Sequence, residues 1–202
     1  MSTGELEAAS AVRPVPHAIV QAAASGDLPE WTQAIEVRRE HMARVSHMLR
    51  RWAEQRGEAD QEVVRWVALG YLHDIMRDAD PAAMRAMVDP TFASLSDKAL
   101  HGPAAAVRLR ECGVEDDELV HAVECHTLGS RGFRDLGKAL YAADFLEPGR
   151  KTEGEWQAGL RERLPFELEA VVREIAGARI GYMIERGRPI RVETADFWNS
   201  MV

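Results

Sequence analysis

The sequence contains only two cysteines, Cys112 and Cys125, in 202 residues. Two thiols cannot form the disulfide framework that stabilises many small secreted proteins, so we expect a reducing, cytoplasmic location. The N-terminus is acidic and lacks the basic-then-apolar pattern of a signal peptide. No apolar run approaches the roughly 20 residues that a membrane-spanning helix requires, and the sequence therefore predicts a soluble protein with no membrane partner.

Basic residues are too few to coat a nucleic acid. Lys and Arg number 25 against 33 Asp and Glu, which gives a formal net charge of -8. We therefore expect no nucleic-acid partner. An acidic protein can still bind an anionic substrate if a metal and several arginines are concentrated in one pocket.

Convincing strand pairs, internal repeats and low-complexity tracts are also missing, while apolar residues recur at helical intervals along most of the chain. The prediction is an all-α helical bundle, and the length suits a single globular domain. Residues 1–28 are expected to be an N-terminal extension, partly disordered but with a short helix over residues 17–24. Residues 29–202 are expected to form the domain itself.

Capping residues give the expected helix boundaries. Asp27, followed by Pro29 and Glu30, predicts the start of a long helix that ends near Gly57. The next helix begins at Asp60 and carries His73-Asp74 near its end. Further helices are expected over residues 81–88, 103–113, 118–126, 136–146 and 165–185, followed by an extended segment over 188–192 and a last short helix capped by Thr194.

An adjacent histidine and aspartate, His73 and Asp74, interrupt an apolar helix. Alone, the pair is better explained by a buried hydrogen bond than by a metal site. Asp144 also lies in an apolar stretch, where its carboxylate must be neutralised. With His41, His101 and His126, the candidates amount to four imidazoles and two carboxylates on separate helices, which a bundle can bring together. This donor set suits iron, manganese or another divalent first-row metal better than calcium or a structural zinc ion.

The order of these residues resembles the HD superfamily of metal-dependent phosphohydrolases, which is named for the His-Asp doublet. The short motifs around these residues resemble, more specifically, those of the YqeK-type symmetrical bis(5′-nucleosyl)-tetraphosphatases, over roughly residues 35–192. The motifs are Arg38-Arg39-Glu40-His41, Leu72-His73-Asp74, Leu100-His101-Gly102, His126-Thr127-Leu128-Gly129, Tyr141-Ala142-Ala143-Asp144-Phe145-Leu146-Glu147-Pro148-Gly149-Arg150 and Gly187-Arg188-Pro189-Ile190.

The resemblance implies an HD-domain enzyme in which a metal-activated water attacks a phosphoanhydride and converts diadenosine tetraphosphate into two ADP. It implies that His41, His73, Asp74 and Asp144 hold an iron ion, and that His101 and His126 hold a second metal or contact phosphate. Asp74, His101 and His126 are the expected catalytic residues. The implied substrate-binding residues are Arg38, Asp74, His101, His126, Thr127, Arg150, Gly187, Arg188, Pro189, Ile190, Arg191 and Val192.

Two other functions stay open. An HD phosphohydrolase could act on another nucleotide or phosphate ester, and a nucleotide-sensing module could keep the ligands without turnover. The metal is one or two divalent ions, with iron first and manganese next. The sequence leaves the oligomeric state open, with a homodimer among the options, and it leaves open the role of the N-terminal extension.

Overall fold

The structure is a computed structural model that describes residues 15–149 and 154–202. All regular structure within these ranges is helical, which confirms the all-α prediction. No helix among the described residues is long and apolar enough to cross a membrane. The α-helices are α1 (Ala18–Ala24), α2 (Glu36–Arg56), α3 (Asp60–Leu72), α4 (Pro81–Met87), α5 (His101–Glu111), α6 (Asp117–Cys125), α7 (Asp135–Leu146), α8 (Glu155–Arg163), α9 (Leu168–Glu185) and α10 (Val192–Asn199), and the short 3-10 helices are η1 (Pro90–Phe92) and η2 (Asp97–Ala99).

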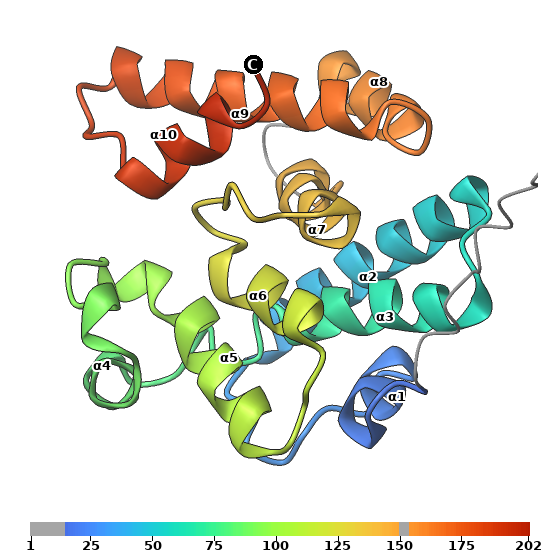
Figure 1. Ribbon diagram of the computed structural model, residues 1–202, viewed down its shortest axis with the longest axis vertical. Coiled ribbons are helices and arrows are strands. Elements are labelled where there is room, and N and C mark those ends of the chain that lie inside the picture. The colour runs from blue at the N-terminus through green and yellow to red at the C-terminus, as the bar shows by residue number, and fades with distance from the viewer. Residues whose placement is uncertain (1–14, 150–153) are drawn as a thin grey trace, which may run out of the picture.

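Helix α7 lies at the centre of the bundle. Most of its residues are buried and apolar, including Leu140, Tyr141 and Leu146, as expected for a helix that is surrounded on all sides. It contacts α2, α3, α6, α8 and α9. Figure 1 shows α7 between the α2–α3 pair and the layer that α8, α9 and α10 form. Asp144 therefore projects from the most enclosed helix of the fold.

Helices α2 and α3 approach each other at a glycine. A Cβ atom on Gly70 would lie 2.4 Å from the Cα of Ser46, so only glycine permits this backbone distance. Ser46 Oγ donates a 2.9 Å hydrogen bond to the carbonyl of Val67 across the same crossing. The close approach brings His41 on α2 next to His73 at the end of α3, with ring centroids 5.4 Å apart.

Helices α5 and α6 repeat this arrangement. A Cβ atom on Gly102 would lie 2.8 Å from the carbonyl oxygens of Val123 and Glu124. The glycine follows His101 directly, and His126 follows the last residue of α6. The two imidazole centroids are 4.9 Å apart. Two glycine-mediated helix crossings therefore place four histidines on one interior surface.

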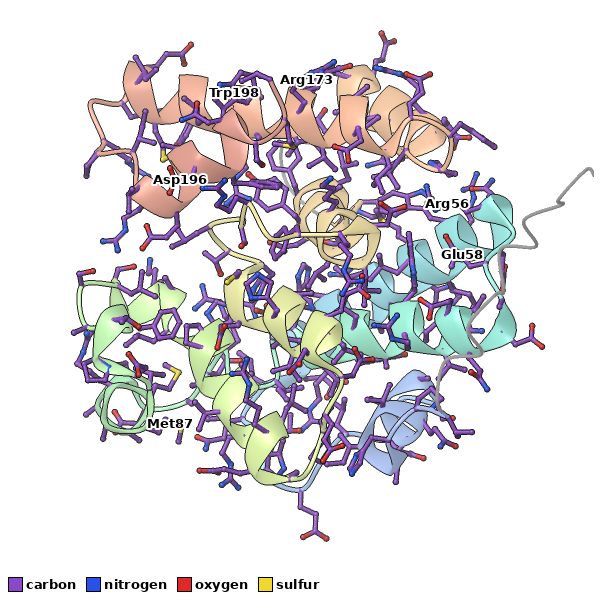
Figure 2. All side chains as sticks on the ribbon, viewed as in Figure 1. Arg56, Glu58, Met87, Arg173, Asp196 and Trp198 are labelled. Atoms are coloured by element: carbon purple, nitrogen blue, oxygen red, sulfur yellow. The ribbon has the colours of Figure 1, made fainter. Side chains whose placement is uncertain are left out.

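The C-terminal helices cover the loop after α6. Phe197 on α10 is fully buried, and its ring lies 5.0 Å from that of Tyr141 on α7. Trp198, labelled in Figure 2, packs on α9, where a Cβ atom on Gly177 would lie 3.1 Å from its indole. Arg173, also labelled there, donates to the carbonyl of Met201. Trp198 thus packs within its own chain.

The short helix predicted over residues 17–24 is present as α1, and it packs against α3. His17 caps it by accepting a hydrogen bond from the backbone of Ile19, and its Val20 and Ala23 are fully buried. Residues 1–14 of the expected extension lie outside the described residues.

The predicted helix start at Asp27 is wrong, because α2 begins at Glu36. The chain before α2 pairs instead with the segment after α3. The backbone of Gln33 donates to Ile75 O at 2.7 Å and accepts from Asp78 N at 3.0 Å. These tertiary hydrogen bonds outweigh the local capping pattern.

Other helix boundaries differ by smaller amounts. Helix α5 begins at His101 rather than at residue 103, and α9 begins at Leu168 rather than at residue 165. Thr194 is not a cap: it lies inside α10, and its hydroxyl donates to Leu128 O at 3.0 Å. The sequence pattern does not predict helix α8, because only Leu160 among its residues is buried and no apolar stripe marks it.

We expect Gly70→Ala to destabilise the protein by about 1–3 kcal/mol, because the new methyl group collides with the α2 backbone. Gly181→Ala on α9 is the matched control, since nothing lies within 4 Å of its Cβ position. That change should stabilise the helix by roughly 0.5–1 kcal/mol. Urea unfolding of both variants measures the difference, and equal effects would contradict the close α2–α3 contact.

Candidate metal centre

Four buried histidines from separate helix ends and faces surround one buried aspartate. His73 caps α3 at its C-terminus, and Asp74 follows it with 4% of its surface exposed. His41 comes from α2, His101 starts α5, and His126 caps α6. Each of these histidines is at most 7% exposed. The fold therefore brings together five of the six predicted metal ligands, with four histidines around Asp74.

Both carboxylate oxygens of Asp74 are engaged. A charged group tolerates such enclosure only when cationic or hydrogen-bonding partners replace water. Oδ1 faces His101 Nε2 at 2.9 Å and His126 Nε2 at 3.7 Å, while Oδ2 faces Arg38 Nη1 at 3.0 Å, His73 Nε2 at 3.7 Å and His41 Nε2 at 3.9 Å.

Three of the histidines are oriented by backbone carbonyls. In each, Nδ1 lies at hydrogen-bond distance from the carbonyl oxygen three residues earlier, so Nδ1 carries the proton and donates it. The Nε2 lone pair is then left to face the cluster, which is the tautomer that a metal ligand requires. The pairs are His73 with Gly70 at 2.8 Å, His101 with Lys98 at 2.9 Å, and His126 with Val123 at 2.7 Å.

His41 is oriented by a carboxylate instead. Its Nδ1 lies 3.3 Å from Glu147 Oε2, and Glu147 Oε1 accepts from Arg44 Nε and from the backbone of Gly149. Burial alone would raise the pKa of Glu147, but the hydrogen bond from Arg44 lowers it below its usual range. Glu147 is thus an ionised partner that fixes the ring of His41. The sequence patterns assign it no role, although a buried acid in an apolar stretch is the same signal that singles out Asp144.

Asp144, the sixth predicted ligand, lies at the more exposed side of the cluster. Its Oδ1 is 3.2 Å from His41 Nε2, and 21% of its side chain is exposed. Burial lowers the pKa of His41, but the hydrogen bond to Asp144 and the nearby Asp74 and Glu147 raise it overall. A group of three acids around one imidazole favours a positive charge at this point.

The protonation states of the other groups suit a cation. Burial lowers the pKa of His73, and burial with the neighbouring His101 and His73 lowers that of His126 to about 3. Burial would raise the pKa of Asp74, yet the contacts with His73 and His101 bring it well below its usual range. Neutral imidazoles beside an ionised carboxylate are the forms that bind divalent metals.

Two observations fit a metal between these side chains. His73 Nε2 is buried without a hydrogen-bond partner. His101 Nε2 and His126 Nε2 lie 3.0 Å apart, although both Nδ1 atoms already face carbonyls, so two lone pairs meet. The ligand atoms of two groups lie within 4.8 Å of one another: His41, His73 and Asp74, and Asp74, His101 and His126.

Two further predicted residues lie beside the cluster. Arg38 contacts Asp74, and its Nε is buried with no hydrogen-bond partner. Thr127 Oγ1 lies 3.3 Å from His126 Nε2.

Arg179 on α9 donates to the carbonyl of Thr127 at 2.8 Å and lies over the ring of Tyr141 at 4.7 Å. Sequence reasoning missed Arg179, since no motif marked it.

The loop after α6 is held by a close contact. Gly129 has a φ of +83°, and a Cβ atom there would lie 2.2 Å from the ring of Phe197. The glycine of the predicted His-Thr-x-Gly motif is therefore required both by its backbone conformation and by its packing against Phe197. It keeps Thr127 against the cluster.

The remaining predicted substrate-binding residues lie farther along the chain. Residues 187–190 are exposed after the end of α9. Arg191 donates to Ser94 O and Oγ at 3.0 and 2.9 Å and pairs with Glu193. No hydrogen bond or ion pair between residues 187–192 and the His/Asp cluster is found in the part of the chain that the structure describes. Arg150 lies outside the described residues.

The family profile described as HD domain matches residues 38–175, which is more than half of the chain. The chain belongs to the HD domain family. A solved structure of a "predicted HD superfamily hydrolase involved in NAD metabolism", from Clostridium acetobutylicum, has the same fold. Its TM-score is 0.70 at 22% identity, over 90% of this chain and 94% of that chain.

Three curated relatives are each named symmetrical bis(5'-nucleosyl)-tetraphosphatase. The protein from Halalkalibacterium halodurans is 25% identical over 150 residues, which are 71% of this chain and 78% of the relative. That from Staphylococcus aureus is 27% identical over 64% of this chain and 70% of the relative, and that from Bacillus subtilis is 29% identical over 50% and 54%. These matches confirm the resemblance found in the sequence words, and with it the prediction of an HD-domain hydrolase.

We expect Glu147→Gln to weaken divalent-metal binding by about 10–100-fold, because the amide cannot hold His41 as an ionised carboxylate does. Glu40→Gln is the matched control, since Glu40 also faces Arg44, but its side chain is exposed and is not paired with His41. Calorimetric titration with Mn²⁺ compares the two variants. Equal affinities would show that Glu147 does not orient a metal ligand.

Proposed function

We propose that this chain hydrolyses diadenosine tetraphosphate and related dinucleoside polyphosphates symmetrically, so that diadenosine tetraphosphate gives two ADP. The names of three relatives support this substrate class. The observation that carries the proposal is the preset direction of the imidazoles, whose Nε2 atoms face the ionised Asp74. Such a cluster suits a cation that neutralises phosphate charge.

The proposed metal is iron, with manganese as a functional substitute. His41, His73, Asp74 and Asp144 would hold one ion, and His101 and His126 would take a second ion or contact phosphate. The donors are nitrogen and oxygen without sulfur, which favours a first-row metal of this kind. When bound, the metal supplies a low-pKa water and neutralises phosphoryl oxygens.

The residues of the cluster would have different roles in the reaction. Asp74 presents two oxygens to the interior and is ionised, so we assign it the role of accepting a hydrogen bond from the attacking water. His101 and His126, on its Oδ1 side, would position that water or a phosphoryl oxygen. Burial of all three keeps bulk water away, which strengthens each of these interactions.

Substrate phosphates would meet positive charge at the edge of the cluster. The side chain of Arg38 is 29% exposed and pairs with Asp74 through Nη1, so the rest of its guanidinium can take a phosphate. Thr127 lies beside His126 and would donate its hydroxyl. We propose that Arg150 and residues 187–192 bind the outer phosphates and the nucleoside, because their sequence motifs resemble those of the family.

Incubation with diadenosine tetraphosphate and ferrous or manganous ion should yield ADP as the sole nucleotide product. Chromatography of the products measures this directly. Equal amounts of AMP and ATP would contradict symmetrical cleavage, and a higher kcat/KM for another nucleotide in a substrate panel would reassign the substrate. No turnover with any divalent metal would contradict the enzyme itself.

We expect His73→Ala to lower kcat by at least about 100-fold, because it removes a buried nitrogen that no other side chain can replace. His47→Ala is the matched control, since His47 is exposed on the same helix as His41. Steady-state kinetics at fixed Mn²⁺ compares the variants. Loss of activity in His47→Ala, or full activity in His73→Ala, would contradict this site.

Protein purified without added metal should contain iron, and chelation should abolish activity that ferrous or manganous ion restores. Elemental analysis before and after chelation, paired with the ADP assay, measures both effects. The reason is the sulfur-free set of imidazoles and carboxylates around Asp74. Activity that survives complete removal of metal would contradict the prediction.

A further inference from the structure

We propose that His121, Glu124 and Cys125 form a second metal site for a thiophilic divalent cation such as Zn²⁺. This site is separate from the cluster of histidines around Asp74, called the HD cluster below. The three side chains lie on the outer side of α6 and in its last turns, all partly buried. None of them belongs to the motifs that resemble the HD family, and the proposed hydrolysis uses none of them.

The spacing of the ligand atoms suits tetrahedral coordination. His121 Nδ1 lies 3.8 Å from Cys125 Sγ and 3.7 Å from Glu124 Oε2, and all three ligand atoms lie within 4.8 Å of one another. Tetrahedral bonds of about 2.0–2.3 Å place neighbouring ligand atoms about 3.3–3.7 Å apart. Small side-chain movements would therefore close the site on an ion. Three protein ligands leave the fourth position to water.

The imidazole is already oriented for this role. His121 Nε2 lies 2.9 Å from Ser130 Oγ, and Ser130 Oγ also accepts from the backbone of Gly132 at 3.1 Å. The ring of Phe133 packs edge-on against His121 at 5.7 Å. A hydrogen bond to the far nitrogen is the usual way in which proteins fix a metal-binding histidine. Here it leaves Nδ1 directed at the sulfur and the carboxylate.

Glu124 is oriented in the same manner. Its Oε1 accepts a 2.8 Å hydrogen bond from Arg110 on α5, while Oε2 faces His121. Each of the two non-sulfur ligands thus has one atom held by the protein and one atom directed at the position of the cation.

The donor chemistry separates this site from the HD cluster. Sulfur, nitrogen and oxygen together select zinc-like ions, whereas the HD cluster offers only nitrogen and oxygen. Cys125 lines a small cavity of about 40 Å³ with Thr127 and Leu128, on the side of the loop that follows α6. An ion here would tie α6 to that loop through Ser130 and to α5 through Arg110 (Figure 1).

Titration of the full-length, metal-free protein with Co²⁺ tests the proposal. Cobalt bound to a thiolate gives a near-ultraviolet charge-transfer band that a sulfur-free site cannot give. We expect this band in the wild type, its loss in Cys125→Ser and its displacement by Zn²⁺. Cys112→Ser is the matched control and should keep the band, because Cys112 lies at the other end of the neighbouring helix, at the C-terminus of α5.

Two further variants sharpen the result. Ser130→Ala removes no ligand and should weaken Co²⁺ binding at this site about 10–100-fold. His73→Ala should leave the band unchanged, which makes the outcome independent of the hydrolase activity. Absence of the band in the wild type, its persistence in Cys125→Ser, or its loss in Cys112→Ser or His73→Ala would each overturn the proposal.

Discussion

The buried carboxylate of Asp74 is the constraint on which the rest of the site depends. An ionised group with 4% exposure must receive hydrogen bonds or positive charge in place of water. Arg38 supplies one charged hydrogen bond, and the Nε2 atoms of His73 and His101 converge on the same carboxylate. This convergence on Asp74 arranges the ligands of a cation, which would supply the remaining positive charge that the buried carboxylate needs. Folding and metal binding are thus linked through one side chain.

The helices can meet this demand only because two glycines let backbones touch. Gly70 admits Ser46 of α2, and Gly102 admits the carbonyls of α6. Each glycine is close in sequence to a histidine of the cluster, so the packing contact and the ligand belong to the same helix turn. A bulkier residue would collide with the facing backbone and push the helices apart, which would move the histidine nitrogens away from Asp74. The precision of the site therefore comes from backbone packing rather than from long side chains.

The sequence was sufficient for the helical class and for the four histidines and two aspartates that meet. An acid in an apolar stretch, such as Asp144, needs a partner wherever it lies in the fold, and this requirement is visible without coordinates. The start of α2 could not be predicted, because the backbone of Gln33 pairs with residues more than forty positions away. Helix α8 could not be predicted for a different reason, since it buries only Leu160 and carries no apolar stripe. Arg179 acts through a tertiary contact with Thr127 that no local pattern encodes.

Histidines at helix ends explain why the ligands occur where they do. The last carbonyls of a helix lack intrahelical partners, and a histidine just beyond them can donate Nδ1–H to one. His73 does this for Gly70 in α3, and His126 does it for Val123 in α6. The bond satisfies the helix end and, in the same step, fixes the tautomer whose Nε2 faces inward. A ligand oriented in this way loses little entropy when a cation binds, because the helix has already fixed the ring. A local interaction that ends one helix thereby prepares a site that is built from five helices.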